Sequence, residues 1–120
     1  MDAMFRFNSD FNQPIENRDT GNVQHMGAMF MNARAFNQPI GQWNTSNVKY
    51  MYEMFENAEA FNQYIGDWDT HNVQKIYSIF KNAKSFNQSV EHWDLSSATY
   101  MTDMFKGSSY SHSIPVKQNK

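Results

Sequence analysis

The chain has 120 residues, a formal net charge of −2 and no cysteine. This length fits one domain, and the absence of cysteine excludes disulfides, Cys-ligated metals and thiol catalysis. The small negative charge and the scattered basic residues give no electrostatic footprint for nucleic-acid binding.

The chain repeats itself every 25 residues, and the tripeptide Phe-Asn-Gln marks each repeat. Other positions at the same spacing hold nearly constant apolar residues. This is typical of a repeat array, in which neighbouring units stack to bury a common core. The clearest columns are Phe11, Phe36, Phe61 and Phe86; Phe5, Phe30, Phe55, Phe80 and Phe105; Met29, Met54, Ile79 and Met104; and Trp43, Trp68 and Trp93.

The first half of each unit predicts a short helix. Its apolar residues recur in steps of three and four, which is one face of a helix. The residues ahead of them, Asn44-Thr45-Ser46 in one unit and Asp69-Thr70 in the next, suit the capping of a helix N-terminus. In the central unit the apolar positions are Val48, Met51, Met54, Phe55 and Ala58.

The second half of each unit predicts a short strand, because Phe61 to Ile65 alternates between apolar and polar residues. Pro14 and Pro39 lie inside the equivalent segments, where proline cannot donate a ladder hydrogen bond. The strand is therefore very short, or it is shifted by a residue or two. The two halves together predict an α/β fold: an LRR-like, right-handed solenoid of about five 25-residue coils, with a short parallel sheet on one face and short helices on the other.

The terminal units depart from the pattern. Arg18 stands in the tryptophan column, and residues 110–114, Tyr-Ser-His-Ser-Ile, resemble a degraded Phe-Asn-Gln unit with one residue deleted. We predict a single solenoid domain at residues 1–114 and a disordered tail at residues 115–120. Met4, Phe5 and Phe11 need cover at the N-terminal end, which indicates a larger parent protein, self-association or a chain cut in mid-unit.

The pattern V-x-x-M-x-x-M-F-x-x-A-x-x-F-N-Q-x-I-x-x-W-[DN]-T, from Val48 to Thr70, resembles a known family. It is similar to the repeats of about 25–26 residues in bacterial surface proteins and surface lipoproteins that are grouped with the BspA-like leucine-rich repeats. The resemblance implies a leucine-rich-repeat-like solenoid, location at the cell surface or secretion, and roles in adhesion and contact with host proteins. It supplies no catalytic residue and no cofactor.

The Phe-Asn-Gln triplets have two interpretations. They are either a recognition surface or a stacked Asn and Gln ladder beside a phenylalanine column, and we favour the ladder because a residue repeated in every unit usually serves the unit. The methionines share columns with Ile76 and Ile79, which indicates core packing and not copper(I) ligation. We therefore expect no cofactor.

The polar residues offer little catalytic chemistry. The chain has no nucleophile elbow, phosphate loop or zinc motif, and its four histidines fall at different positions of the unit, so they do not converge on a metal. We predict that the protein is not an enzyme. The rival interpretation requires a pocket that gathers His71, His92 and a carboxylate.

The positions that vary between units and point outward are the candidates for binding. Tyrosine is favoured at interfaces because it buries a large rigid ring and keeps a polar tip. The alternative is that these rings only fill space between neighbouring coils. The candidate protein-binding residues are Tyr50, Tyr52, Tyr64, Tyr77 and Tyr100.

The sequence thus predicts a non-catalytic, adhesion-type protein-interaction module of a bacterial surface or secreted protein. Its expected partner is a protein, such as a host extracellular protein, and not nucleic acid. No apolar run approaches the ~18 residues that insert into a membrane, and the start, MDAMFRFNSD, is not a signal peptide. The alternative function is a self-assembling structural solenoid that stacks through its open coil ends.

Overall fold

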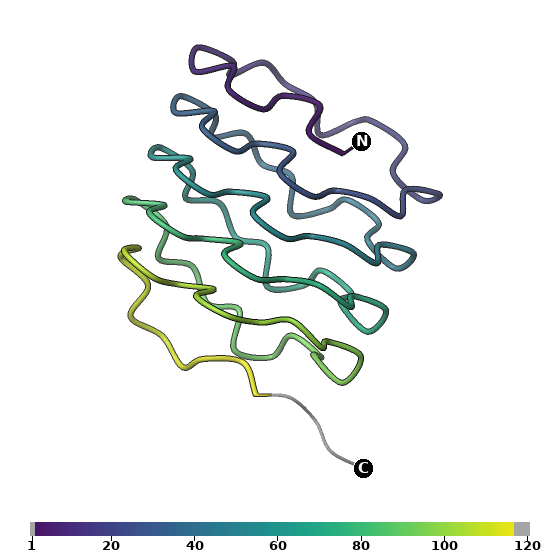
Figure 1. Ribbon diagram of the computed structural model, residues 1–120. Coiled ribbons are helices and arrows are strands. Elements are labelled where there is room, and N and C mark those ends of the chain that lie inside the picture. Colours follow the sequence, from purple (N-terminus) through teal and green to yellow (C-terminus); the bar gives the residue numbers. More distant parts are fainter. Residues whose placement is uncertain (1, 117–120) are drawn as a thin grey trace.

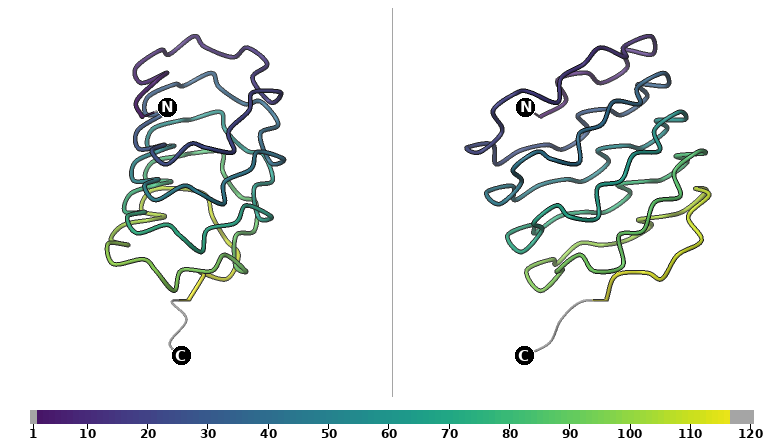
Figure 2. Two further views of the ribbon diagram at one scale, coloured as in Figure 1. Left: turned by 90° about the vertical axis from the view of Figure 1, so that its right-hand side faces the viewer. Right: turned by 180° about the vertical axis from the view of Figure 1, so that it is seen from behind.

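The computed structural model describes residues 2–116. These residues form no helix and no strand, and they run as turns joined by irregular extended stretches. Within them, regular backbone pairing is limited to three isolated parallel bridges, which link His25 to Tyr50, Tyr50 to Lys75, and Lys75 to Tyr100. The chain makes one lap for each sequence repeat, and the laps stack from the N-terminal to the C-terminal end (Figure 1). The same stack is seen from the side and from behind in Figure 2.

The predicted α/β fold, an LRR-like right-handed solenoid with a sheet face and a helix face, is therefore wrong. Residues 48–58, predicted as a helix, instead form turns at 52–57 with non-helical backbone on either side, and Glu53 and Asn57 have φ angles of 57° and 59°. A right-handed helix needs negative φ at every residue. Successive turns produce the same apolar spacing, since the N–H of Met54 donates to the carbonyl three residues back, on Met51, at 3.3 Å.

These turns build one wall of the stack, which we call the turn wall: residues 2–8, 26–33, 51–58, 76–83 and 101–108. In each lap but the last, every second N–H donates to a carbonyl of the next lap. Met51 and Glu53 donate in this way to Lys75 and Tyr77, each at 2.9 Å. The direction is the same at every joint of this wall, from each lap toward its C-terminal neighbour. The positive-φ donors include Asn32, Asn57 and Asn82, a residue type that tolerates this conformation.

The opposite wall contains the Phe-Asn-Gln triplets and is not a strand either. Here side chains provide the bonds between laps. The backbone N–H of Asn62 donates to Oδ1 of Asn37 at 2.9 Å, and Nε2 of Gln63 donates to the carbonyl oxygen and Oδ1 of Asn37, both at 3.1 Å. The prediction of an Asn and Gln ladder is confirmed. Since this ladder uses side-chain groups, Pro39 loses no bond by lacking an N–H.

The core between the two walls is a double column of phenylalanine rings. The ring centroid of Phe55 lies 5.6 Å from Phe30 in the lap before and 5.7 Å from Phe80 in the lap after, and it pairs with Phe61 of its own lap at 4.1 Å. These four rings are fully buried. The indole of Trp68 lies beside them, and its N–H donates to a carbonyl of the preceding lap at 3.1 Å. The core is therefore continuous along the stack.

The degraded unit near the C-terminus occupies the place that the sequence predicts. The Tyr110 ring stacks on Phe86 with centroids 6.2 Å apart. The N–H of Ser111 donates to Oδ1 of Asn87 at 2.8 Å, and Nε2 of His112 lies 2.9 Å from the Asn87 carbonyl oxygen. Tyr110-Ser111-His112 thus replaces Phe-Asn-Gln position for position.

The first lap replaces the tryptophan with Arg18. The Arg18 guanidinium carbon lies 5.8 Å from the Phe5 ring centroid, where later laps place an indole against the equivalent ring.

The boundary between the predicted domain, residues 1–114, and its predicted tail, residues 115–120, stays a prediction. Residues 117–120 of that tail, like Met1, lie outside the described residues.

Candidate functional site

The bridge positions carry a row of side chains that differ from lap to lap. The His25 and Tyr50 rings lie 4.8 Å apart between centroids. The Lys75 Nζ lies 5.6 Å from the ring centroids of both Tyr50 and Tyr100, which places the ammonium between two aromatic rings at cation–π distance. The backbone frame is therefore constant at this row, while its chemistry alternates between aromatic and cationic groups.

A second row of tyrosines adjoins the first. The Tyr52 and Tyr77 rings stack with centroids 5.3 Å apart, and Tyr52 lies 6.4 Å from Tyr50. The Tyr52 ring covers Gly27, because a Cβ on that glycine would lie 2.5 Å from the ring carbon Cζ. We call the two rows together the aromatic face: His25, Tyr50, Tyr52, Lys75, Tyr77 and Tyr100.

The hydroxyl groups of the second row, on Tyr52 and Tyr77, stay protonated. Burial, followed by the negative charge of Asp2, raises the pKa of the Tyr52 hydroxyl above its usual value of about 10. Burial, followed by Glu53, raises the pKa of Tyr77 in the same direction. Both phenols therefore keep their protons at neutral pH and can donate hydrogen bonds.

Tyr64 lies apart from this face, on the wall of the Phe-Asn-Gln triplets. It borders a shallow cavity of about 340 Å³ whose lining also includes Pro39, Gly41 and Asp67. Its hydroxyl lies 3.3 Å from Oδ1 of Asp67, and burial followed by that carboxylate raises its pKa. Four of the five predicted tyrosines are thus brought together and one is not.

Sequence reasoning missed two members of the aromatic face, His25 and Lys75. The signal was present, because both residues occupy the same position of the unit as Tyr50 and Tyr100. Selecting only the tyrosines at these positions left His25 and Lys75 out.

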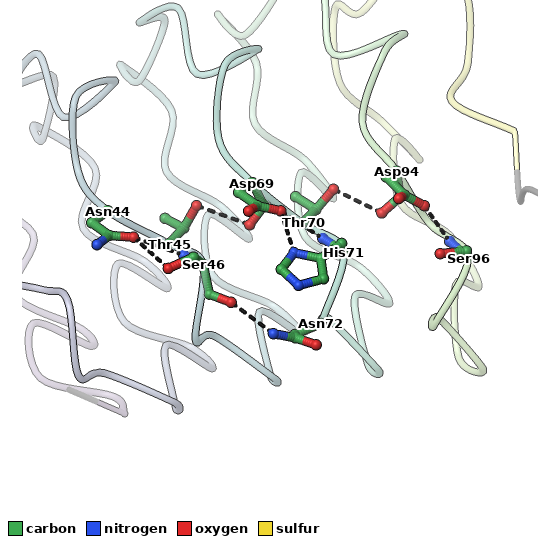
Figure 3. Close-up of polar contacts among 9 residues, drawn as sticks. All are labelled: Asn44, Thr45, Ser46, Asp69, Thr70, His71, Asn72, Asp94 and Ser96. Atoms are coloured by element: carbon green, nitrogen blue, oxygen red, sulfur yellow. Dashed lines mark hydrogen bonds and ion pairs between the residues drawn. The ribbon is translucent and has the colours of Figure 1, made fainter.

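The residues predicted as helix caps instead close tight turns. Oδ1 of Asp69 accepts the backbone N–H of His71 at 3.1 Å, two residues further on, which is an Asx turn. Asn44 and Asp94 repeat this geometry in the neighbouring laps (Figure 3). After Asn44 and Asp69 a buried threonine hydroxyl bonds to the next lap: Thr45 Oγ1 donates to the Asp69 carbonyl at 3.0 Å, and Thr70 Oγ1 to the Asp94 carbonyl at 2.9 Å.

The imidazole of His71 also contacts Asp69, with Nδ1 2.5 Å from Oδ1 (Figure 3). Burial raises the pKa of the Asp69 carboxyl, but the hydrogen bonds from His71 outweigh it, and the pKa lies below its usual range. His92 contacts another carboxylate, with Nε2 3.8 Å from Glu91 Oε1, and its side chain is 89% exposed. The two histidines do not share a partner.

At no place in residues 2–116, the described part of the chain, do three or more His, Asp or Glu side chains gather as a metal site requires. Nor does this part contain a helix with the length and apolar character that crossing a bilayer demands.

The sequence matches a family model described as "Mycoplasma protein of unknown function, DUF285", and the match extends over residues 1–117. Comparisons with curated proteins and with solved structures find no match. The family match covers all the laps described above, from the first turn to the degraded Phe-Asn-Gln unit. The chain therefore belongs to the DUF285 family.

Proposed function

We propose that the chain is a non-catalytic protein-interaction module that binds a protein partner through the aromatic face. The observation that carries the proposal is the row from His25 to Tyr100. Its backbone is fixed by a bridge at every lap, and its side chains change from lap to lap. A repeated frame with variable outward side chains is the arrangement by which repeat proteins form binding surfaces.

The chemistry of this face suits a protein partner. Tyrosine combines large apolar area with a hydrogen-bonding tip, and it loses little conformational entropy on binding. Stacking already restricts Tyr52 and Tyr77, and Lys75 is held between two rings. A partner therefore meets side chains that are largely ordered before contact, which reduces the entropic cost of binding.

The location and the finer family assignment belong to the same proposal. The motif from Val48 to Thr70 resembles the repeats of BspA-like bacterial surface proteins, and this resemblance supports display on a cell surface or secretion. On that basis we propose a host extracellular protein as the partner and adhesion as the role.

The test is a pull-down with immobilised chain against purified host extracellular proteins. We expect the triple variant Tyr50→Ala/Tyr52→Ala/Tyr77→Ala to lose binding roughly tenfold or more, because aromatic anchors dominate interface energies. Tyr64→Ala is the matched control, since it removes an exposed tyrosine from the opposite wall.

Folding of the variants must be separated from binding. Lys75→Ala/Tyr100→Ala removes the exposed part of the first row, where Tyr100 is 57% exposed and contributes little to the core. Thermal unfolding checks that both variants keep the native fold. Unchanged binding by two folded variants would rule out the aromatic face as the binding surface.

A further inference from the structure

The two ends of the turn wall present opposite hydrogen-bonding groups. In the last lap, four backbone N–H groups have the same direction as the equivalent groups of earlier laps. None of the four has an acceptor within residues 2–116. They belong to Met101, Asp103, Phe105 and Gly107. We call this row the donor edge. It follows from the single direction of the bonds on this wall.

The first lap shows the complementary arrangement. The carbonyls of Asp2, Met4 and Arg6 correspond to those that accept bonds in every later lap, and they accept none from residues 2–116. We call this row the acceptor edge. Within residues 2–116, three carbonyls at one end thus lack a donor, and four N–H groups at the other end lack an acceptor.

Apolar groups at the two ends match in the same way. The Phe5–Phe11 pair, with centroids 4.0 Å apart, and the Phe105–Tyr110 pair, at 4.2 Å, are only partly buried, unlike their equivalents in inner laps. Met4 is 47% exposed, whereas its equivalents in the second and third laps are fully buried.

The end that carries the donor edge is also hollow. A cavity of about 320 Å³ opens there, lined by Met101, Met104, Phe105, Ile114 and Pro115. Its lining is mainly apolar, so a surface that fills it must supply apolar side chains. The partly exposed Met4, Phe5 and Phe11 are side chains of that kind.

We propose that the 120-residue chain associates head to tail, with the acceptor edge of a second copy seated on the donor edge of the first. Inside the molecule each donor bonds to the residue 24 positions later, as Ser78 bonds to Thr102. Continuing this register places the N–H groups of Asp103, Phe105 and Gly107 opposite the carbonyls of residues 2, 4 and 6 of the second copy. Both phenylalanine columns then continue across the joint.

The polarity of the edges dictates the kind of assembly. If two donor edges met, N–H groups would face N–H groups. If two acceptor edges met, carbonyls would face carbonyls. Neither pairing forms hydrogen bonds on the turn wall. The contact is therefore heterologous, and repeated addition extends the stack along its axis. One pair of like charges opposes the head-to-tail association, because Arg6 of the second copy would lie one lap beyond Lys106. Since salt screens like charges, added salt strengthens the association.

The experiment is sedimentation velocity of the whole chain over a range of concentrations. Met4→Lys places a charge beside the acceptor edge, and Ile114→Lys places one at the cavity; Ile114 is 63% exposed, so folding should tolerate the change. We expect wild type to grow with concentration and each variant alone to associate roughly tenfold or more weakly. Tyr64→Lys, at a 51% exposed position on a side wall, is the control and should behave as wild type.

Mixing the two edge variants decides the polarity. Met4→Lys retains a free donor edge and Ile114→Lys a free acceptor edge, so an equimolar mixture should form a 1:1 dimer that goes no further. A wild-type chain that stays monomeric at the highest concentration overturns the proposal. So does a mixture that remains monomeric, or a Tyr64→Lys variant that weakens association equally. Binding to a host protein through the aromatic face is a separate readout, which neither edge variant should change.

Discussion

The side-chain Oδ1 of Asn62 accepts the backbone N–H of Asn87 at an N···O distance of 2.9 Å. The same oxygen accepts Nε2 of Gln88 at 3.2 Å, while the Asn62 backbone carbonyl lies 3.4 Å from that nitrogen. The Asn62 side-chain nitrogen makes no hydrogen bond within the described residues. Asn62 therefore serves the next lap as an acceptor.

An acceptor role makes aspartate a better replacement for Asn62 than alanine. Asn62→Ala should lower the free energy of unfolding by about 1–2 kcal/mol, because two bonds are lost and water replaces them only in part. Asn62→Asp keeps the oxygen and should lose less than half as much. Urea unfolding at neutral pH measures both, and equal losses would contradict the acceptor role.

Backbone conformation at Asn57 gives a second prediction. Its φ of 59° is unfavourable for most side chains, and the same column holds Gly107. Asn57→Ala should destabilise the fold by about 1 kcal/mol, while Asn57→Gly should be nearly neutral. Glu56 is the control, because its φ is not positive and Glu56→Gly should therefore be the costlier glycine substitution. Thermal unfolding of the three variants measures the order of their stabilities.

The contribution of the buried threonine hydroxyls to stability can be tested by removing one and by adding one. Thr45→Val removes the bond to the Asp69 carbonyl with little change of shape, and it should cost about 1 kcal/mol. Leu95 is the next member of this column after Thr70, and residues 2–116 contain no carbonyl one lap beyond it. Leu95→Thr should therefore destabilise as well, since it buries a hydroxyl and removes apolar volume. A stabilising Leu95→Thr would show that an acceptor exists there.

The Asp69–His71 pair predicts a dependence on pH. The folded-state pKa of Asp69 lies below its usual range, so its stabilisation is present above the unfolded-state pKa of about 3.9 and is lost as pH falls through the folded-state value. His71→Ala should raise the Asp69 pKa, although the backbone N–H of residue 71 still donates. An NMR titration of the Asp69 carboxyl carbon measures this. His92→Ala should leave that titration unchanged, and an identical curve for both variants would contradict the assignment.

Much of the packing was predictable because it depends on residue type at a fixed period. The phenylalanine columns, the Asn and Gln ladder and the substitution of Tyr110 for phenylalanine follow from aligning the chain with itself. Stacked laps place equivalent residues in contact, so a constant column implies a row of touching side chains. Phe55 between Phe30 and Phe80 is the clearest case.

The local backbone was not predictable in the same way. Steps of three and four indicate a helix, but turns closed by bonds to the third residue back give the same spacing, and a glutamate such as Glu53 does not reveal a positive φ. Two residues did carry a warning. Pro39 stood where a strand needed a donor, and Gly107 marked a column with a left-handed backbone.

The candidate site was predictable only in part, because the residue type in its surface columns changes from lap to lap. Four of the tyrosines meet since their positions coincide in the repeat, and Tyr64 falls on the opposite wall for the same reason. Lys75 belongs with Tyr50 and Tyr100 through the bridge pattern, which the amino-acid types do not reveal.

The common direction of the backbone hydrogen bonds on the turn wall also has an electrostatic consequence. Aligned peptide dipoles add, as they do in an α-helix, so this wall is partially negative near residues 2–6 and partially positive near residues 101–107. Arg6 and Asp103 each lie at the end that favours their charge, by ~0.3–1 kcal/mol for exposed groups, whereas Lys106 lies at the end that does not. Inserting another 25-residue lap would move the positive end outward without altering any joint. Polarity along the axis is thus built into the repeat, whatever the number of laps.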